Sequence, residues 1–263
     1  MKIVFIGDVV GSPGRDAVRE ILPRLKKKEK IDFVIANAEN SAGGSGITSR
    51  VANDLFNSGC DVLTAGDHIW RRYDVVDVLN NDKRLIRPLN LPEGVPGAGY
   101  NIYKTDTGVK IAVVSLLGQV FIEAQTSSPF ITMKDLLPKL KPEADIIIVD
   151  IHAEATSEKV ALSWFLDGEV SALLGTHTHV QTADEKIMPK GMAYITDVGM
   201  AGPFDSVIGR NKDKIIERFM TGMPARSELG TEDVRMQGVM LEIDENTGKA
   251  ISIQRLNEKA QAI

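Results

Sequence analysis

The chain has 263 residues, 43% of them hydrophobic, so it is long enough to bury a substantial core and is not expected to be disordered. Its 31 basic and 36 acidic residues give a net charge of -5, which excludes a global attraction to phosphate backbones or anionic membranes. We therefore expect no membrane partner and no strong non-specific binding of nucleic acid.

The cysteine content and the first residues indicate the compartment. The single Cys60 excludes an intrachain disulfide and a cysteine-based zinc cluster, and it fits a reducing environment. The opening segment MKIVFIGDVVG has no basic n-region and no small-residue cleavage pattern, which argues against a signal peptide. No run of the sequence approaches the roughly 18 apolar residues that span a bilayer. We expect a cytoplasmic protein.

Short β-branched apolar runs alternate with amphipathic segments, as is typical of α/β proteins built from crossover units. The expected strands cover, in chain order, residues 2–7, 32–38, 61–66, 110–117, 145–151, 172–176, 192–198, 238–244 and 250–256. The expected helices lie near residues 14–29, 48–58, 73–80, 134–140, 156–167 and 211–220. The early strands are almost continuously hydrophobic, which indicates burial on both faces, and the last two are expected to form an antiparallel hairpin.

From these elements we expect one domain, residues 1–263, in which a mixed sheet or two stacked sheets are covered by helices. Residues 81–100 are rich in Pro and Gly, like a linker. Because a structureless stretch of about 20 residues is uncommon inside a domain, we interpret this segment as a long functional loop.

Residues able to bind a metal follow the ends of several expected strands. They are, in chain order, Asp8, Glu39, Asn40, Asp67, His68, His152, His177 and His179. All four histidines of the chain belong to this set. Because ligands of open α/β sheets bind at the carboxyl ends of the strands, we expect these side chains to meet at one edge.

Taken singly, each of these residues has a simpler interpretation. Asp8 stands shortly before a turn-forming Gly-Pro segment and could be a turn or capping acid. Asp67 and His68 could cap the helix that follows, and His152 could be a core imidazole bonded to the backbone. Only the joint pattern favours a metal site.

His177 and His179 are two residues apart, where an apolar run gives way to polar residues. On an extended backbone the two imidazoles would point the same way and could share one target, whereas on a helix they would diverge. The alternative is a polar strand end with two solvated imidazoles.

The three acids, one amide and three or four imidazoles exceed what one ion needs and suit two divalent ions. Mixed oxygen and nitrogen ligands favour Fe, Mn, Zn or Ni over Mg or Ca. Our first expectation is Fe or Mn, with Zn, Ni or Mg as alternatives. Two ions about 3.5–4 Å apart are a common device for phosphoester hydrolysis, because they lower the pKa of a bridging water and clamp the phosphoryl oxygens.

Short motifs carry a family resemblance. GD at 7–8, AEN at 38–40, GDH at 66–68, IH at 151–152 and GTHTH at 175–179 resemble the calcineurin-like metallophosphoesterases. With ENSAGGSGIT at 39–48 and YITDVGMAGPFDSVIG at 194–209, they are similar to the bacterial YmdB-type subfamily of 2',3'-cyclic-nucleotide phosphodiesterases. The resemblance implies an α/β four-layer sandwich of two mixed β-sheets flanked by α-helices, with a dimetal site at the carboxyl ends of the strands.

The resemblance also implies roles for the site residues. One metal would take Asp8, Glu39 and His179, with Asn40 nearby or ligating. The other would take Glu39 as the bridge, together with Asp67, His152 and His177. His68 would lie just outside and protonate the leaving oxygen while a metal-bridging hydroxide attacks the phosphorus of a 2',3'-cyclic, or also a 3',5'-cyclic, nucleotide.

Three positions depart from the wider superfamily pattern, and the first two narrow the assignment. Val10 stands where a histidine usually follows the first Asp by two residues, and Glu39 replaces the usual bridging Asp. Both are similar to the YmdB-type variant and support the narrower assignment. Asp67 stands where GNH is the more familiar form, and it adds one negative charge to the site.

Weaker signals concern the substrate. The segment SAGGSG at 41–46 contains Gly43 and Gly44, whose backbone N–H groups could contact a phosphate; the alternative is an ordinary glycine-rich turn. Arg71 could pair with a phosphate and the adjacent Trp70 could stack on a base, although Trp70 could equally pack in the core.

Two other functions remain open from sequence alone. The same site could serve a phosphomonoesterase or protein phosphatase, or the chain could be a regulatory nucleotide- or RNA-binding protein with little turnover. A homo-oligomer is also left open, and a small phosphodiester is the expected partner of the site.

Overall fold

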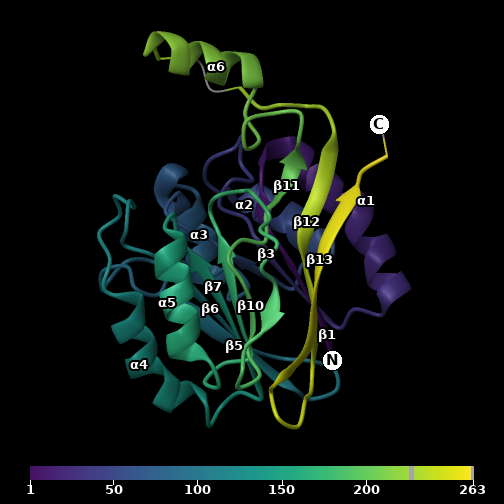
Figure 1. Cartoon of the computed structure of the whole chain (residues 1–263), viewed down its shortest axis with the longest axis vertical. Helices are drawn as coiled ribbons and strands as arrows, with labels where there is room; N and C mark the ends of the chain where they lie inside the picture. The colour runs from purple at the N-terminus through teal and green to yellow at the C-terminus, as the bar shows by residue number, and fades with distance from the viewer. Residues whose placement is uncertain (225–227, 262–263) are drawn as a thin grey trace.

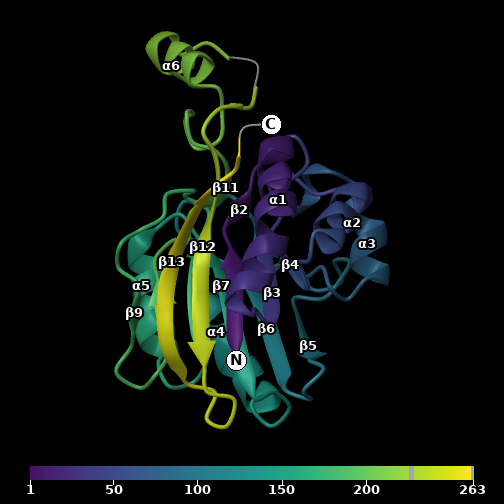
Figure 2. The same ribbon diagram turned by 90° about the vertical axis from the view of Figure 1, so that its right-hand side faces the viewer.

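Two mixed β-sheets stack face to face between two layers of helices in the computed structural model, which describes residues 1–224 and 228–261 (Figure 1 and Figure 2). The first sheet has the order β2 (Asp8–Val9), β11 (Met200–Pro203), β12 (Val234–Ile243), β1 (Lys2–Ile6), β3 (Phe33–Asn37) and β4 (Val62–Thr64), and β13 (Ala250–Lys259) pairs with β12. The second has the order β5 (Tyr100–Lys104), β6 (Lys110–Leu117), β7 (Ile146–His152), β8 (Ala172–Thr176), β10 (Ala193–Ile195) and β9 (Lys186–Ile187).

Each sheet carries helices on its outer face. The first sheet is covered by α1 (Gly11–Glu29), α2 (Ser49–Asn57) and α3 (Val75–Asn81). The second is covered by α4 (Pro129–Leu140) and α5 (Thr156–Leu166). A short 3-10 helix, η1 (Ile69–Arg71), follows β4, and α6 (Lys212–Thr221) lies apart from both layers (Figure 1). No helix in the described part of the chain is long and apolar enough to cross a membrane.

The alternation of side chains along the strands builds three cores. Ile3 and Phe5 of β1 face the second sheet and pack in the cluster that contains Ile148 of β7. Val4 and Ile6 of the same strand face the opposite way, into the cluster formed with α1, α2 and α3. Both faces of β1 are therefore buried, which explains its uninterrupted hydrophobic sequence.

The expected class, two mixed sheets flanked by helices, is confirmed, and all the expected strands and helices are present with small shifts at their ends. The expected hairpin is β12 and β13, which pair antiparallel. Four strands, β2, β5, β9 and β11, were not expected from the sequence. β2 and β9 have two residues each, and β5 is a half-exposed edge strand without an apolar run, so none of them carries the periodic signal of a buried strand.

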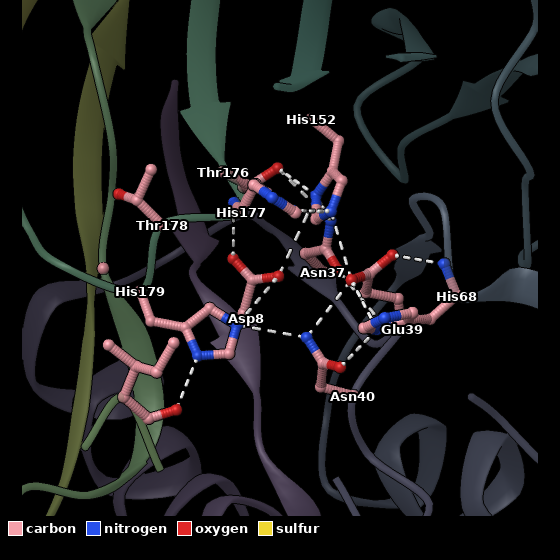
Figure 3. A network of polar contacts seen from close by, with 12 residues as sticks. Asp8, Asn37, Glu39, Asn40, His68, His152, Thr176, His177, Thr178 and His179 are labelled. Carbon is pink, nitrogen blue, oxygen red and sulfur yellow. Dashed lines mark hydrogen bonds and ion pairs between the residues drawn. The ribbon is translucent and has the colours of Figure 1, made fainter. Parts of the chain in front are cut away.

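The parallel strands fix the position of the polar residues. β1, β3 and β4 run parallel in one sheet, and β6, β7, β8 and β10 run parallel in the other. The segments that leave the carboxyl ends of β1, β3, β4, β7 and β8 meet at one end of the stacked sheets (Figure 3). Residues 82–99, part of the expected long loop, connect α3 to β5.

The projecting helix α6 has no buried residue, and Phe219 and Met220 on it are 82% and 80% exposed. We expect the double replacement Phe219→Ser and Met220→Ser to change the free energy of unfolding by no more than about 0.5 kcal/mol, because exposed side chains lose little on replacement. Thermal unfolding measures this, with Leu162→Ala in the buried face of α5 as the destabilised control, expected to cost about 2–5 kcal/mol. A much larger decrease in the free energy of unfolding of the double variant would show that α6 packs against another surface in solution.

Candidate metal centre

Acidic and imidazole side chains gather where the strand-end segments meet. Glu39, Asp67, His152 and His177 each offer one ligand atom within 4.8 Å of the others. His152 Nε2 lies 3.1 Å from Glu39 Oε1 and 3.3 Å from Asp67 Oδ1. His177 Nδ1 lies 2.9 Å from His152 Nε2 and 3.7 Å from Asp67 Oδ1. Four predicted ligands from four segments of the chain therefore share one small volume.

A second group of predicted ligands adjoins the first. Asn40 Nδ2 lies 3.1 Å from His179 Nε2, and Asp8 Oδ1 lies 3.8 Å from the same nitrogen (Figure 3). Asn40 Nδ2 also donates to Glu39 Oε1 at 3.2 Å. Glu39 thus contacts both groups, through Asn40 on one side and His152 on the other.

The donor set has the chemistry that divalent cations require. Asp8 Oδ1 and Asp67 Oδ1 are buried without a hydrogen-bond partner among the described residues. Burying a carboxylate oxygen without a hydrogen-bond partner costs free energy. Burial also disfavours the charged form of Asp8 and so raises its pKa. One of these oxygens lies in each group of predicted ligands, so cations would compensate both. The residues therefore fit two ions, with Glu39 between them.

A hydrogen-bond chain behind His152 sets its tautomer. Its Nδ1 lies 2.9 Å from Thr176 Oγ1, and that hydroxyl donates to Asp150 Oδ1 at 2.7 Å. Because the Thr176 proton points to Asp150, its oxygen accepts from His152, so Nδ1 carries the ring proton. Asn37 Nδ2 donates to the other Asp150 oxygen at 3.0 Å, and burial raises the pKa of Asp150 to about 6. The Nε2 lone pair of His152 therefore faces the centre.

The other two imidazoles are oriented in the same manner. His177 Nε2 lies 3.1 Å from Glu154 Oε2, and His179 Nδ1 lies 2.9 Å from the carbonyl oxygen of Ile208. A carboxylate and a carbonyl only accept hydrogen bonds, so these ring nitrogens carry the protons. Nδ1 of His177 and Nε2 of His179 are therefore unprotonated, and both face the predicted ligands, as in metal-binding histidines.

The backbone of His177 and His179 differs from the expected extended strand. Their φ angles are 102° and 64°, in the left-handed region that bulky residues rarely adopt. The backbone is therefore not extended there, and the condition under which both side chains would point the same way is not met. His177 turns toward Asp67 and His152, while His179 turns toward Asp8, so the two histidines serve opposite sides of the centre.

A buried ion pair holds this loop from behind. Lys159 on α5 and Asp197 after β10 are both fully buried, and Lys159 Nζ lies 3.0 Å from Asp197 Oδ2. Lys159 also donates to the carbonyl of Thr176 at 2.7 Å. Asp197 accepts from the backbone N–H and the hydroxyl of Thr178 at 3.0 and 2.9 Å. These contacts fix the residues on either side of His177.

His68 stands at the edge of the centre. Its Nδ1 lies 2.9 Å from Asn40 Oδ1, and its backbone N–H donates to Glu39 Oε2 at 3.2 Å. A side-chain hydrogen bond to Glu39 raises the pKa of the His68 imidazole. Because Nδ1 is engaged with Asn40, Nε2 is the nitrogen available for a proton transfer.

The predicted substrate-binding residues do not all line the same cavity. Gly44 lines a cavity of about 350 Å³ together with His68 and His179. Gly43 is exposed and lies outside that lining. Arg71 lines a neighbouring cleft that also contains Asp67.

Several residues that shape the site were missed by the sequence analysis. They are Asn37, Asp150, Glu154, Lys159, Thr176, Asp197 and Arg210. Arg210 donates to the carbonyl of Gly44 and lines the same cavity. The alternation in VDIH at 149–152 could have indicated that Asp150 lies two residues before His152 on the same strand face. The sequence carries no signal that pairs Lys159 with Asp197.

Two mixed sheets between helical layers, with acids, an amide and imidazoles at the strand ends, define a metallophosphoesterase fold. A phosphatase from Mycoplasma pneumoniae has this fold, with a TM-score of 0.92 and 40% identity over 98% of this chain and 93% of that chain. A hypothetical protein from Thermus thermophilus gives a TM-score of 0.93 with 37% identity, covering 99% of this chain and 100% of that one.

The family follows from the sequence comparisons. The 2',3'-cyclic-nucleotide 2'-phosphodiesterase of Bacillus subtilis strain 168 is 46% identical over 256 residues, covering 97% of this chain and 96% of that protein. The family model described as YmdB-like protein matches residues 4–256. The chain belongs to the YmdB-like family, which confirms the resemblance found in its motifs.

Proposed function

We propose that this protein is a phosphodiesterase that uses two divalent metal ions to hydrolyse 2',3'-cyclic nucleotides. The main support for this proposal is the buried centre. Two buried carboxylate oxygens there have no hydrogen-bond partner among the described residues, and three imidazoles each turn one unprotonated nitrogen toward the predicted ligands, as a cation site requires. The name of the Bacillus subtilis relative supports the choice of substrate. Fe or Mn remains our first choice of metal.

The residues present would hold the ions in two groups. Asp8 and His179 would bind one, with Asn40 beside them, and Asp67, His152 and His177 would bind the other. Glu39, in contact with both groups, would bridge them. When bound, such ions lower the pKa of a water and neutralise charge that develops on the phosphoryl oxygens.

The protein's own proton donor is His68. Its Nδ1 proton is donated to Asn40 Oδ1, which fixes the ring and leaves Nε2 to deliver a proton. Cleavage of the 2' ester by water breaks the bond between phosphorus and O2', and the departing oxygen takes that proton. The products are a 2'-hydroxyl and a 3'-phosphate.

The first experiment measures metal stoichiometry by elemental analysis after loading with Fe or Mn and desalting. We expect about two ions per chain. The loaded protein is then assayed with 2',3'-cyclic AMP, 3',5'-cyclic AMP and the monoester adenosine 3'-monophosphate. Hydrolysis of the 2',3'-cyclic diester supports the proposal; two ions with hydrolysis of the monoester alone would make the protein a phosphomonoesterase, and one or no ion would contradict the dimetal centre.

His68→Ala is expected to lower turnover of 2',3'-cyclic AMP by about 10²–10⁴-fold while both metals are retained. The loss should be much smaller with bis(p-nitrophenyl) phosphate, because p-nitrophenolate departs without needing a proton. Steady-state kinetics with both substrates, beside elemental analysis, measures this. Equal losses on both substrates, or loss of metal, would assign His68 a structural or ligand role instead.

Asp67→Asn is expected to weaken metal retention while keeping or increasing turnover at saturating metal. The replacement removes one negative charge, so the centre holds its cation less firmly and attracts an anionic diester more. Asp67 Oδ1 is buried and lies 3.3 Å from His152 Nε2, so the change acts at the centre itself. Metal titration and initial rates check both parts. An inactive variant with its full metal content would refute the charge argument.

A further inference from the structure

We propose that a cleft beside the candidate metal centre binds the nucleobase of the substrate, with Trp70 and Phe121 as its stacking surfaces. This inference rests on the proposed function and specifies the part of the substrate that lies outside the reacting phosphate. The cleft has a volume of about 700 Å³, within the range of small-molecule sites.

The cleft opens directly onto the centre. Asp67 and His177, which belong to the group of predicted metal ligands, form part of its lining. His177 also lines the cavity that contains His68. A diester whose phosphate lies at the centre therefore has the rest of its structure next to this cleft.

Trp70 is held at a fixed place relative to the centre. It belongs to η1, which begins directly after His68 and is anchored by the fully buried Ile69. The backbone N–H of Arg71 donates to the carbonyl of His68 at 2.9 Å. Trp70 itself remains 39% exposed and lines the cleft, so it presents an indole surface there instead of packing fully in the core.

Phe121 lines the cleft from another loop. It is 86% exposed and has a φ of 61°, a conformation that is a strained outlier for a bulky residue. The loop is tied at its start by Glu158 of α5, whose carboxylate accepts from the backbone N–H of Gln119 at 2.9 Å and of Val120 at 3.3 Å. An exposed aromatic ring kept in a strained conformation on an anchored loop indicates a binding role.

Asn90 joins the walls of the cleft. This buried residue donates through Nδ2 to the carbonyls of Leu117 and Ser127, both at 2.8 Å, and its backbone carbonyl accepts from the Ser127 N–H at 2.8 Å. The loop that carries Phe121 is thereby bound to the segment that supplies Leu91, another lining residue. The long loop between α3 and β5 thus forms one wall of the cleft.

The chemistry of the lining suits a heterocyclic base. Two aromatic side chains and an apolar wall accept a flat π-system, and Arg71 adds donors for acceptor atoms on the edge of the base. Stacking depends little on which base is bound, so we expect all four 2',3'-cyclic nucleotides to be accepted.

The chain offers a direct reporter, because it has only two tryptophans, Trp70 and Trp164. Trp164 is 59% exposed on α5 and lies outside the cleft, so Trp164→Phe leaves Trp70 as the single tryptophan with little risk to the fold. The metal-loaded variant is titrated with adenosine 3'-monophosphate and, separately, with ribose 5-phosphate, which lacks a base.

We expect saturable quenching of Trp70 by the nucleotide but not by ribose 5-phosphate. Adding Phe121→Ala should raise the half-saturating nucleotide concentration about five- to tenfold, whereas Phe219→Ala, a similarly exposed phenylalanine on α6, should not change it. No quenching, equal responses to both ligands, or no effect of Phe121→Ala would overturn the base site, and would favour a protein-docking role for the exposed rings.

The experiment separates the two proposals. Base-dependent quenching in a metal-loaded protein that hydrolyses no cyclic nucleotide would support the base site and refute the proposed reaction. Turnover of cyclic nucleotides without a base-dependent response would refute the base site and leave the reaction standing.

Discussion

Gly66→Ala is expected to lower metal affinity by about 10–100-fold and turnover by at least about 100-fold. A Cβ at Gly66 would lie 2.2 Å from Glu39 Oε2 and 2.4 Å from His152 Nε2. Contacts this short cannot exist, so the predicted bridging carboxylate and a predicted imidazole ligand must both move. Gly66 thus allows the segment after β4 to approach the other two strand ends closely enough to form the centre.

Metal titration of the purified variant tests this prediction without relying on activity, and steady-state rates at saturating metal follow. The matched control is Gly94→Ala, where an added Cβ meets nothing within 4 Å and only the positive φ opposes alanine. The control should retain wild-type metal affinity and turnover. A Gly66→Ala variant with unchanged metal affinity would mean that Glu39 and His152 are not held where the structure places them.

Lys159→Met is expected to destabilise the protein by about 3–5 kcal/mol, because it leaves the fully buried Asp197 without its cation. For a chain of this size the corresponding fall in Tm is roughly 6–15 °C. The same replacement removes the donor to the Thr176 carbonyl, so His177 and His179 lose part of their support. Metal affinity should therefore fall together with stability.

Thermal unfolding and metal titration check this result, with Lys134→Met at an exposed position of α4 as the control. The double variant Lys159→Met with Asp197→Asn removes both charges and should recover part of the lost stability. It should not recover metal affinity, because the contact to Thr176 is still absent. A loss below about 1 kcal/mol in the single variant would show that Asp197 finds another partner or takes up a proton.

Much of the fold could be predicted because its signal is local. Strands such as β1 and β7 are buried on both faces, so their near-continuous apolar sequences mark them directly. Most predicted site residues follow such strands. The rule that ligands bind at the carboxyl ends of parallel strands was therefore enough to predict which side chains would lie together.

Other features depend on contacts between distant segments and have no local signal. His177 and His179 adopt left-handed backbones, and the contacts that Lys159 and Asp197 make to Thr176 and Thr178 fix the intervening loop. These contacts could not be read from residue spacing. The same applies to Trp70 and Phe121, which lie 51 positions apart and line one cleft only because separate loops are anchored beside the centre.

The sequence by itself determined the α/β class, the edge of the sheets that carries the centre and the family, because periodicity, strand ends and short motifs are properties of the local chain. The tertiary structure alone decided which nitrogen of each imidazole faces the centre, the left-handed backbone of the two loop histidines and where the aromatic cleft lies. Those features follow from the order in which the strands pair and from the buried polar contacts that this pairing brings together.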